Sequence, residues 1–258
     1  MAKEIDNRER LIFAMDVPDC NQAKQLVDTL GDSVVFFKLG LELMMTDGYF
    51  DLMDWMLKRN KKIFADLKFF DIPATVGAAV NRLQNRGASF VTVHGNQAIM
   101  EAAAKNKGKH LKVLAVTALT SLDRGDLDDM GFSCDIGDLV LSRAKRALEA
   151  GCDGVVSSGL EVPELRKNID SQLLVVTPGI RPVDNKESED QKRVVTVEKA
   201  FKNGADYIVV GRPIRDAGSP RNAAEEIQSS ISALSLIHIS EPTRPERISY
   251  AGFCVKKK

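Results

Sequence analysis

Three charged residues follow one short apolar run in the segment FADLKFFDIPAT, residues 64–75: they are Asp66, Lys68 and Asp71. Side chains alternate in direction along a strand, so Asp66 and Lys68 are expected to point to the same side, with Phe64 below them. Each carboxylate favours the charged form of a neighbouring ammonium group, and the ammonium group favours the charged carboxylate. Lys68 is therefore expected to remain an acid at neutral pH.

An acid of this kind can give its proton to a carbanion. A carboxylate fixed beside a carboxylate of the substrate repels it, and this repulsion ends when carbon dioxide leaves. The arrangement is typical of carbanion chemistry without a metal. A structural ion pair is the alternative interpretation of a DxK motif taken alone.

Further charges are expected at the ends of neighbouring strands, because Asp16 follows the first apolar run and Lys38 lies in the second. Two lysines and up to three carboxylates at one place are costly to desolvate unless they share a task. Asp71 lies past its strand, and Pro73 discourages helix at the residue before it. Asp71 is therefore expected to project over its own site or toward a neighbouring subunit.

Two glycine–arginine clusters occur in the segments VVTPGIRP and IVVGRPI. Gly179 and Gly211 allow backbone N–H groups to approach an anion closely. Arg181 and Arg212 can add bidentate hydrogen bonds to a phosphate. The two clusters therefore predict a phosphate site, with solvated surface arginines as the alternative.

Two polar stretches are candidates for loops over this site. Residues 183–193 form a charged segment without apolar anchors, which is either a solvated loop or a lid, with Gln191 as a possible phosphate contact. The second stretch begins at Thr120 and Ser121, whose hydroxyl groups could bind a heterocycle.

The elements that must position these residues are eight apolar runs separated by amphipathic segments. Three of them repeat one pattern of glycine, small residue, polar residue and β-branched run, at residues 85–95, 149–159 and 202–212. The glycine is typical of a helix C-cap, and the run is typical of a strand buried on both faces. The other five runs end at Asp16, Gly40, Lys68, Leu119 and Gly179.

Strands that alternate with helices indicate parallel βα units, and eight units predict an α/β fold of the (β/α)8 TIM-barrel type. Barrels often bind phosphate on the loops after strands seven and eight, where the glycine–arginine clusters fall. A doubly wound sheet is the alternative, but no GxGxxG follows a strand. We expect one domain over residues 1–234 and a C-terminal appendage over residues 235–258, which resembles a translated adapter-like read-through and is expected to be flexible or non-native.

Composition excludes several classes of protein. Lys plus Arg and Asp plus Glu are 36 each, so the net charge of zero does not favour nucleic acid as a partner. Four cysteines without a CxxC pair argue against a zinc site. No apolar run reaches the roughly 18 residues of a membrane span, and the N-terminal segment is not a signal peptide, so we expect a cytosolic protein.

Together these motifs identify a resemblance. DxKxxDxxxT stands at Asp66, Lys68, Asp71 and Thr75, accompanied by FAMD, FFKLG, TPGIRP and VVGRPI. From about residue 10 to residue 234 the chain resembles the orotidine 5′-monophosphate (OMP) decarboxylase family. The resemblance implies decarboxylation of OMP to UMP, the last step of de novo pyrimidine nucleotide synthesis. It also implies a barrel without metal or cofactor, and a homodimer with active sites shared across the interface.

The resemblance also implies roles for single residues. Lys68 would protonate C6 of the pyrimidine, within a charged array that also contains Lys38, Asp66 and Asp71 of the other subunit. Substrate contacts would fall into three groups: Asp16, Lys38 and Thr75 on the ribose, Thr120 on the pyrimidine, and Arg181, Gln191, Gly211 and Arg212 on the phosphate.

Two alternatives remain open. A magnesium-dependent phosphosugar enzyme can carry a similar DxKxxD motif, and a nucleotide-binding barrel without activity would keep the phosphate site alone. The ending DIPAT and the motif PGIRP argue against the first, and the DxKxxD motif itself argues against the second. His94, at the end of the fourth run, is interpreted as a packing or supporting residue rather than a catalytic one.

Overall fold

The protein is a closed barrel of eight parallel strands, as the sequence predicts. The computed structural model describes residues 3–181 and 194–240, with the side chains of 235–240 excepted. Each strand pairs with the next, and the eighth pairs with the first. The strands are β1 Leu11–Ala14, β2 Phe36–Gly40, β3 Lys62–Phe69, β4 Phe90–His94, β5 Lys112–Val116, β6 Gly154–Val156, β7 Leu174–Thr177 and β8 Tyr207–Val210.

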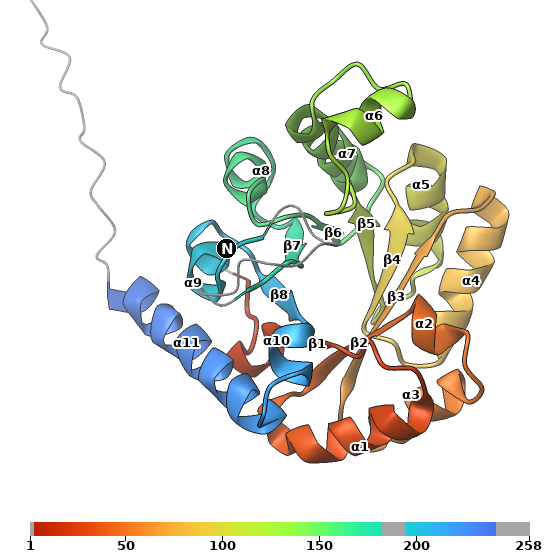
Figure 1. Cartoon of the computed structure of the whole chain (residues 1–258). Helices are drawn as coiled ribbons and strands as arrows, with labels where there is room; N and C mark the ends of the chain where they lie inside the picture. The colour runs from red at the N-terminus through yellow and green to blue at the C-terminus, as the bar shows by residue number, and fades with distance from the viewer. Residues whose placement is uncertain (1–2, 182–193, 241–258) are drawn as a thin grey trace, which may run out of the picture.

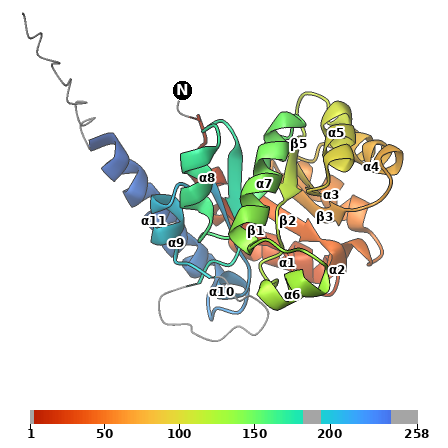
Figure 2. The same cartoon turned by 90° about the horizontal axis from the view of Figure 1, so that it is seen from above.

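Helices surround the strands on all sides (Figure 1). They are α1 Cys20–Leu30, α2 Leu41–Met44, α3 Tyr49–Leu57, α4 Pro73–Asn85, α5 Gln97–Asn106, α6 Arg124–Asp129, α7 Ile136–Glu149, α8 Val162–Asn168, α9 Val197–Lys202, α10 Arg212–Arg215 and α11 Pro220–Ser240. Two short 3₁₀ helices, Asn7–Glu9 and Gly31–Ser33, precede β1 and β2. The helices α6 and α10, which follow β5 and β8, lie at one end of the molecule, away from the N-terminus (Figure 2).

Alternation along the strands divides the core into two layers. One set of side chains fills the barrel interior: Ile12, Ala14, Phe36, Phe64, Phe90, Leu114, Leu174, Val176, Tyr207 and Val209. The alternate residues, such as Phe13, Phe37 and Ala65, pack outward against the helices. Phe64 thus lies inside and Ala65 outside, which is the arrangement expected for β3.

The three repeated segments begin as predicted. Gly87, Gly151 and Gly204 follow α4, α7 and α9 with φ of 79°, 82° and 99°. An L-residue rarely adopts this left-handed conformation, so glycine ends each helix and turns the chain into the next strand.

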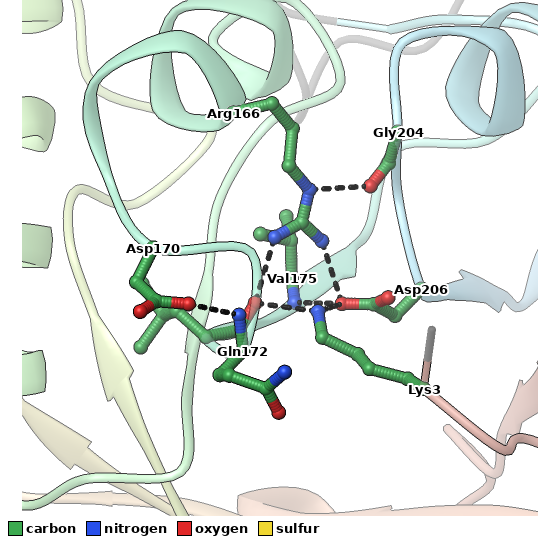
Figure 3. A network of polar contacts seen from close by, with 8 residues as sticks. Lys3, Arg166, Asp170, Gln172, Val175, Gly204 and Asp206 are labelled. Atoms are coloured by element: carbon green, nitrogen blue, oxygen red, sulfur yellow. Dashed lines mark hydrogen bonds and ion pairs between the residues drawn. The ribbon is translucent and has the colours of Figure 1, made fainter. Parts of the chain in front are cut away.

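A polar network ties the N-terminal ends of β7 and β8 together (Figure 3). The carboxylate of Asp206 accepts hydrogen bonds from Lys3 Nζ at 2.6 Å, from Arg166 at 2.6 Å and from the backbone N–H of Val175 at 2.8 Å. Asp153, which precedes β6, accepts the equivalent backbone bond from β5 at 2.8 Å. These aspartates lie at the end of the barrel opposite the strand ends that carry the predicted site, so their contribution is to stability.

The predicted domain end differs from the structure, and two predicted segments lie outside the described residues. Helix α11 continues past Leu234, where the barrel domain was expected to end, to Ser240. Residues 241–258 of the expected appendage, and the predicted lid over 183–193 with Gln191, lie outside the described residues. Within the described part of the chain, no helix is long and apolar enough to cross a membrane. The cytosolic location stays a prediction.

Candidate active site

A cavity of about 540 Å³ opens at the C-terminal ends of the strands. Its walls include most of the residues predicted from the sequence: Asp16, Lys38, Asp66, Lys68, Thr120, Arg181, Gly211 and Arg212. Phe64 and Val209, from the interior layer of the core, also line it. A cavity of this volume is typical of small-molecule sites.

Along one wall, carboxylates and ammonium groups alternate. Lys38 Nζ lies 3.0 Å from Asp16 Oδ1 and 3.6 Å from Asp66 Oδ2. Lys68 Nζ lies 2.8 Å from the same Oδ2 atom of Asp66. The order along the wall is therefore Asp16, Lys38, Asp66, Lys68. Pairing of β1 with β2 and of β2 with β3 brings these residues together, because Lys38 lies opposite both Ala14 and Phe64.

The charges in this array stabilise one another. Burial alone would lower the pKa of Lys38, but the carboxylates of Asp66 and Asp16 outweigh burial and raise it above its ordinary value. Burial alone would raise the pKa of Asp66, but Lys38, Lys68 and a hydrogen bond from Thr92 bring it below its ordinary value. Both Lys38 and Asp66 are therefore charged at neutral pH, although their side chains are only 13% and 12% exposed.

The backbone that carries the array is not a regular strand. β3 and β4 pair at Ala65 with Val91 and next at Phe69 with Val93, so β3 has a bulge between these points. Within the bulge, Lys68 has a left-handed backbone with φ of 47°. Asp66 and Lys68 reach the same side of β3, where their side chains are in contact, but the bulge rather than the alternation expected from the sequence sets the direction of Lys68.

The glycine–arginine clusters form another wall of the same cavity. Gly179 follows β7 with φ of 78°, and Arg181 donates to the carbonyl oxygen of Ile180 at 2.9 Å. A Cβ atom at Gly211 would lie 3.3 Å from Ala14 Cβ, so the end of β8 approaches the end of β1 closely. Arg212 begins α10 directly after it. Both arginines reach the cavity, which the sequence predicts for a phosphate site.

Three residues near the cavity were not predicted from the sequence: Arg215, its partner Asp216, and Gly40 beside Lys38. Arg215 lines the cavity and donates to the backbone carbonyl of Asp16 at 2.7 Å, while Asp216 accepts two bonds from the same guanidinium at 2.6 Å and 3.0 Å. A Cβ atom at Gly40 would lie 3.3 Å from Lys38 Nζ, so a larger residue would press on the ammonium group. Gly40 lies two residues after Lys38, and this spacing on a strand was a usable signal.

Asp71 and Thr75 lie away from this cavity. Both are exposed, and Asp71 Oδ1 accepts the backbone N–H of Ile72 at 2.6 Å. Thr75 is in the first turn of α4, which begins at Pro73. Within the described residues, neither side chain lines the cavity of its own chain.

Four large apolar side chains are exposed near Asp71 in the sequence or in the segment that follows β2. Leu41 and Met45 follow β2 and are 54% and 84% exposed. Phe70 and Ile72 flank Asp71 and are 65% and 66% exposed. We call these four residues the apolar rim. Contiguous exposed apolar surface is typical of interaction sites, so these residues are candidates for contact with another chain.

His94 is half-buried at the end of β4, and its ring lies 4.9 Å from the ring of Phe70. Burial lowers its pKa, and the positive charges of Arg143 and Lys68 lower it further. His94 is not among the residues that line the cavity.

The carboxylates of the site are paired with lysines rather than gathered together. Across residues 3–181 and 194–234, whose side chains the structure describes, no three His, Cys, Asp or Glu residues form a group that could hold a metal ion.

The fold and the site define a class: (β/α)8-barrel enzymes with an alternating lysine–aspartate array at the C-terminal ends of the strands. Residues 9–227 match the model of the orotidine 5′-phosphate decarboxylase / HUMPS family. The chain belongs to this family.

Individual relatives agree with this assignment. The chain is 64% identical over 229 residues to the orotidine 5′-phosphate decarboxylase of Methylococcus capsulatus, which covers 89% of this chain and 94% of that one. It is 49% identical over 226 residues to the enzyme of the same name from Stenotrophomonas maltophilia, and the match covers 87% of this chain and 93% of that enzyme. The crystal structure of orotidine 5′-phosphate decarboxylase from Lactobacillus acidophilus superposes with a TM-score of 0.77 at 35% identity. The superposition covers 86% of this chain and 99% of that one.

Proposed function

We propose that this protein converts OMP to UMP and carbon dioxide without a metal or cofactor. The alternating array of Asp16, Lys38, Asp66 and Lys68 carries the proposal, because it holds a charged ammonium group and a charged carboxylate side by side in one cavity. The names of the relatives with 64% and 49% identity support the same substrate.

In the proposed reaction the bond between C6 and the carboxylate breaks, carbon dioxide leaves, and the electron pair stays on C6. The ammonium group of Lys68 then gives one proton to C6, and solvent restores that proton. Asp66 lies 2.8 Å from Lys68 Nζ, so a substrate carboxylate beside Lys68 would also lie beside a negative charge. The repulsion is present in the bound substrate and ends in the product, so it favours the reaction.

The other residues would bind the nucleotide. We assign the phosphate to Arg181, Gly211, Arg212 and Gln191, the pyrimidine to Thr120, and the ribose to Asp16, Lys38 and Thr75. The glycine–arginine wall and the lysine–aspartate wall belong to one cavity, which matches a substrate with a phosphate at one end and a reacting base at the other. Remote phosphate contacts can contribute to the rate as well as to affinity.

We also propose a homodimer in which Asp71 and Thr75 of each subunit complete the site of the other. Two observations support it: both residues are exposed and outside their own cavity, and Phe70 and Ile72 of the apolar rim flank Asp71 in the sequence. An isologous interface over this rim would bury the apolar side chains and bring two sites together.

The proposed function is tested by incubating the protein with OMP in EDTA and following loss of the orotate absorbance. We expect complete conversion to UMP. A magnesium-dependent phosphosugar enzyme would leave OMP intact, and a binding barrel would bind the nucleotide without turnover. Either result would contradict the proposal.

A further inference from the structure

The bulge in β3 places three residues opposite one. Between the pairs Ala65–Val91 and Phe69–Val93, β3 contains Asp66, Leu67 and Lys68, whereas β4 contains only Thr92. In a regular parallel pair of strands, evenly spaced backbone hydrogen bonds pair the residues of the two strands one to one. Here the side chain of Thr92 takes part in the pairing.

Thr92 is completely buried and contacts both charged residues of the bulge. Its Oγ1 donates to Asp66 Oδ1 at 2.9 Å and accepts the backbone N–H of Lys68 at 2.9 Å. The direction of both bonds is fixed, because an amide N–H can only donate and a charged carboxylate can only accept.

These two bonds act on the features that set the direction of the Lys68 side chain. The backbone of Lys68 has φ of 47°, which a residue with a side chain rarely adopts unless its surroundings hold it there. The bond to the Lys68 N–H holds this turn. The bond to Asp66 Oδ1 leaves the other carboxylate oxygen, Oδ2, to face Lys68 Nζ at 2.8 Å.

We infer that Thr92 is a positioning residue for the decarboxylation, whose hydroxyl group fixes Asp66 and the left-handed turn at Lys68 so that the ammonium group stays over the reacting carbon. The inference rests on the proposed function for its activity readout. Thr92 lies in the middle of β4 and does not line the cavity, so its effect on the reaction is through its two partners.

Loss of the hydroxyl group should change the chemistry more than binding. Asp66 also faces Lys38 from β2, and this ion pair does not depend on Thr92, so the array should keep its charges in a valine variant. The phosphate wall is formed by other strands. Valine has the shape of threonine but cannot donate to Asp66 or accept from Lys68.

The experiment compares Thr92→Val, Thr92→Ser and a matched control, Thr177→Val. Thr177 is equally buried at the end of β7, and in the described part of the chain its Oγ1 has no hydrogen-bond partner. We expect Thr92→Val to lower kcat by about tenfold or more, with KM for OMP within about threefold of wild type. Thr92→Ser, which keeps a hydroxyl group, and Thr177→Val should both keep kcat within about threefold.

A kcat for Thr92→Val within about twofold of wild type overturns the inference, and so does a loss of about tenfold in Thr92→Ser. If Thr92→Val does not fold, Thr92→Ala, which also lacks the hydroxyl group, is measured in its place against the same limits. A crystal structure of Thr92→Val gives a readout without activity: we expect Lys68 Nζ to leave Asp66 Oδ2, and an unchanged contact overturns the inference. Absence of turnover in the wild-type protein would instead contradict the proposed function, while the crystallographic test of Thr92 would still apply.

Discussion

The position of Asp71 leads to a prediction about assembly. Lys68 lines the cavity of its own chain, whereas Asp71 is exposed and outside it. If the dimer is isologous, each site takes Lys68 from one subunit and Asp71 from the other. Lys68→Ala and Asp71→Ala should each abolish turnover. In a mixed dimer, one site then carries both substitutions and the other site carries neither.

The recovered activity follows from this geometry. After equal amounts of the two variants exchange subunits, half of the dimers are mixed, and each mixed dimer has one intact site of two. The mixture should therefore recover about a quarter of wild-type turnover. The assay is loss of the orotate absorbance after mixing, with exchange followed by differently tagged subunits. Two samples of the same variant, mixed with each other, serve as the control and should recover nothing. Demonstrated exchange without recovery would mean that Asp71 acts within its own chain.

Three further predictions concern binding and stability. Arg212→Ala should lower kcat/KM for OMP by about tenfold to a hundredfold and leave orotidine, which has no phosphate, nearly unchanged; equal losses for both substrates would place Arg212 elsewhere. The pKa of Asp66 is lower in the folded protein than its ordinary 3.8, so its contribution to stability is complete above that pH and is lost as pH falls through the folded pKa. Urea unfolding should therefore show wild type losing stability relative to Asp66→Asn below about pH 4, and a constant difference down to pH 3 would refute the linkage. Asp206→Asn should lower the free energy of unfolding by about 3 kcal/mol without changing kcat, because it weakens the pairing with Lys3 and Arg166, whereas exposed Asp28→Asn should change stability little; a loss below about 0.5 kcal/mol would contradict this account.

Much of the fold was predictable from local chemistry. Eight apolar runs became eight strands because parallel strands buried on both faces have a continuous apolar pattern, and the glycines before the repeated runs have the left-handed φ that glycine permits. The order of the strands alone predicts that Lys38 and Asp66 lie at the same end of the barrel. Their contact at 3.6 Å follows from pairing of β2 with β3.

The bulge in β3 was not predictable in the same way. The bulge depends on pairing between β3 and β4, which a local sequence pattern does not show. The left-handed φ occurs at Lys68, and lysine, unlike glycine or asparagine, does not indicate this conformation. Thr92 gave no signal for the same reason, since an isolated threonine in an apolar strand is ordinary. Arg215 was missed because its contact with Asp16 exists only after the barrel closes between β8 and β1.

If Lys68 is the acid of a metal-independent decarboxylase, turnover of OMP in EDTA should depend on its ammonium group, and Lys68→Ala measures this dependence. A matched control is Lys62→Ala, which removes a lysine from the other end of the same strand. We expect Lys68→Ala to lose more than nine-tenths of wild-type kcat, a cost above about 1.4 kcal/mol, while it still folds and binds UMP. Lys62→Ala should keep wild-type turnover. A Lys68→Ala enzyme with more than about a tenth of wild-type kcat would contradict the role of Lys68 as proton donor.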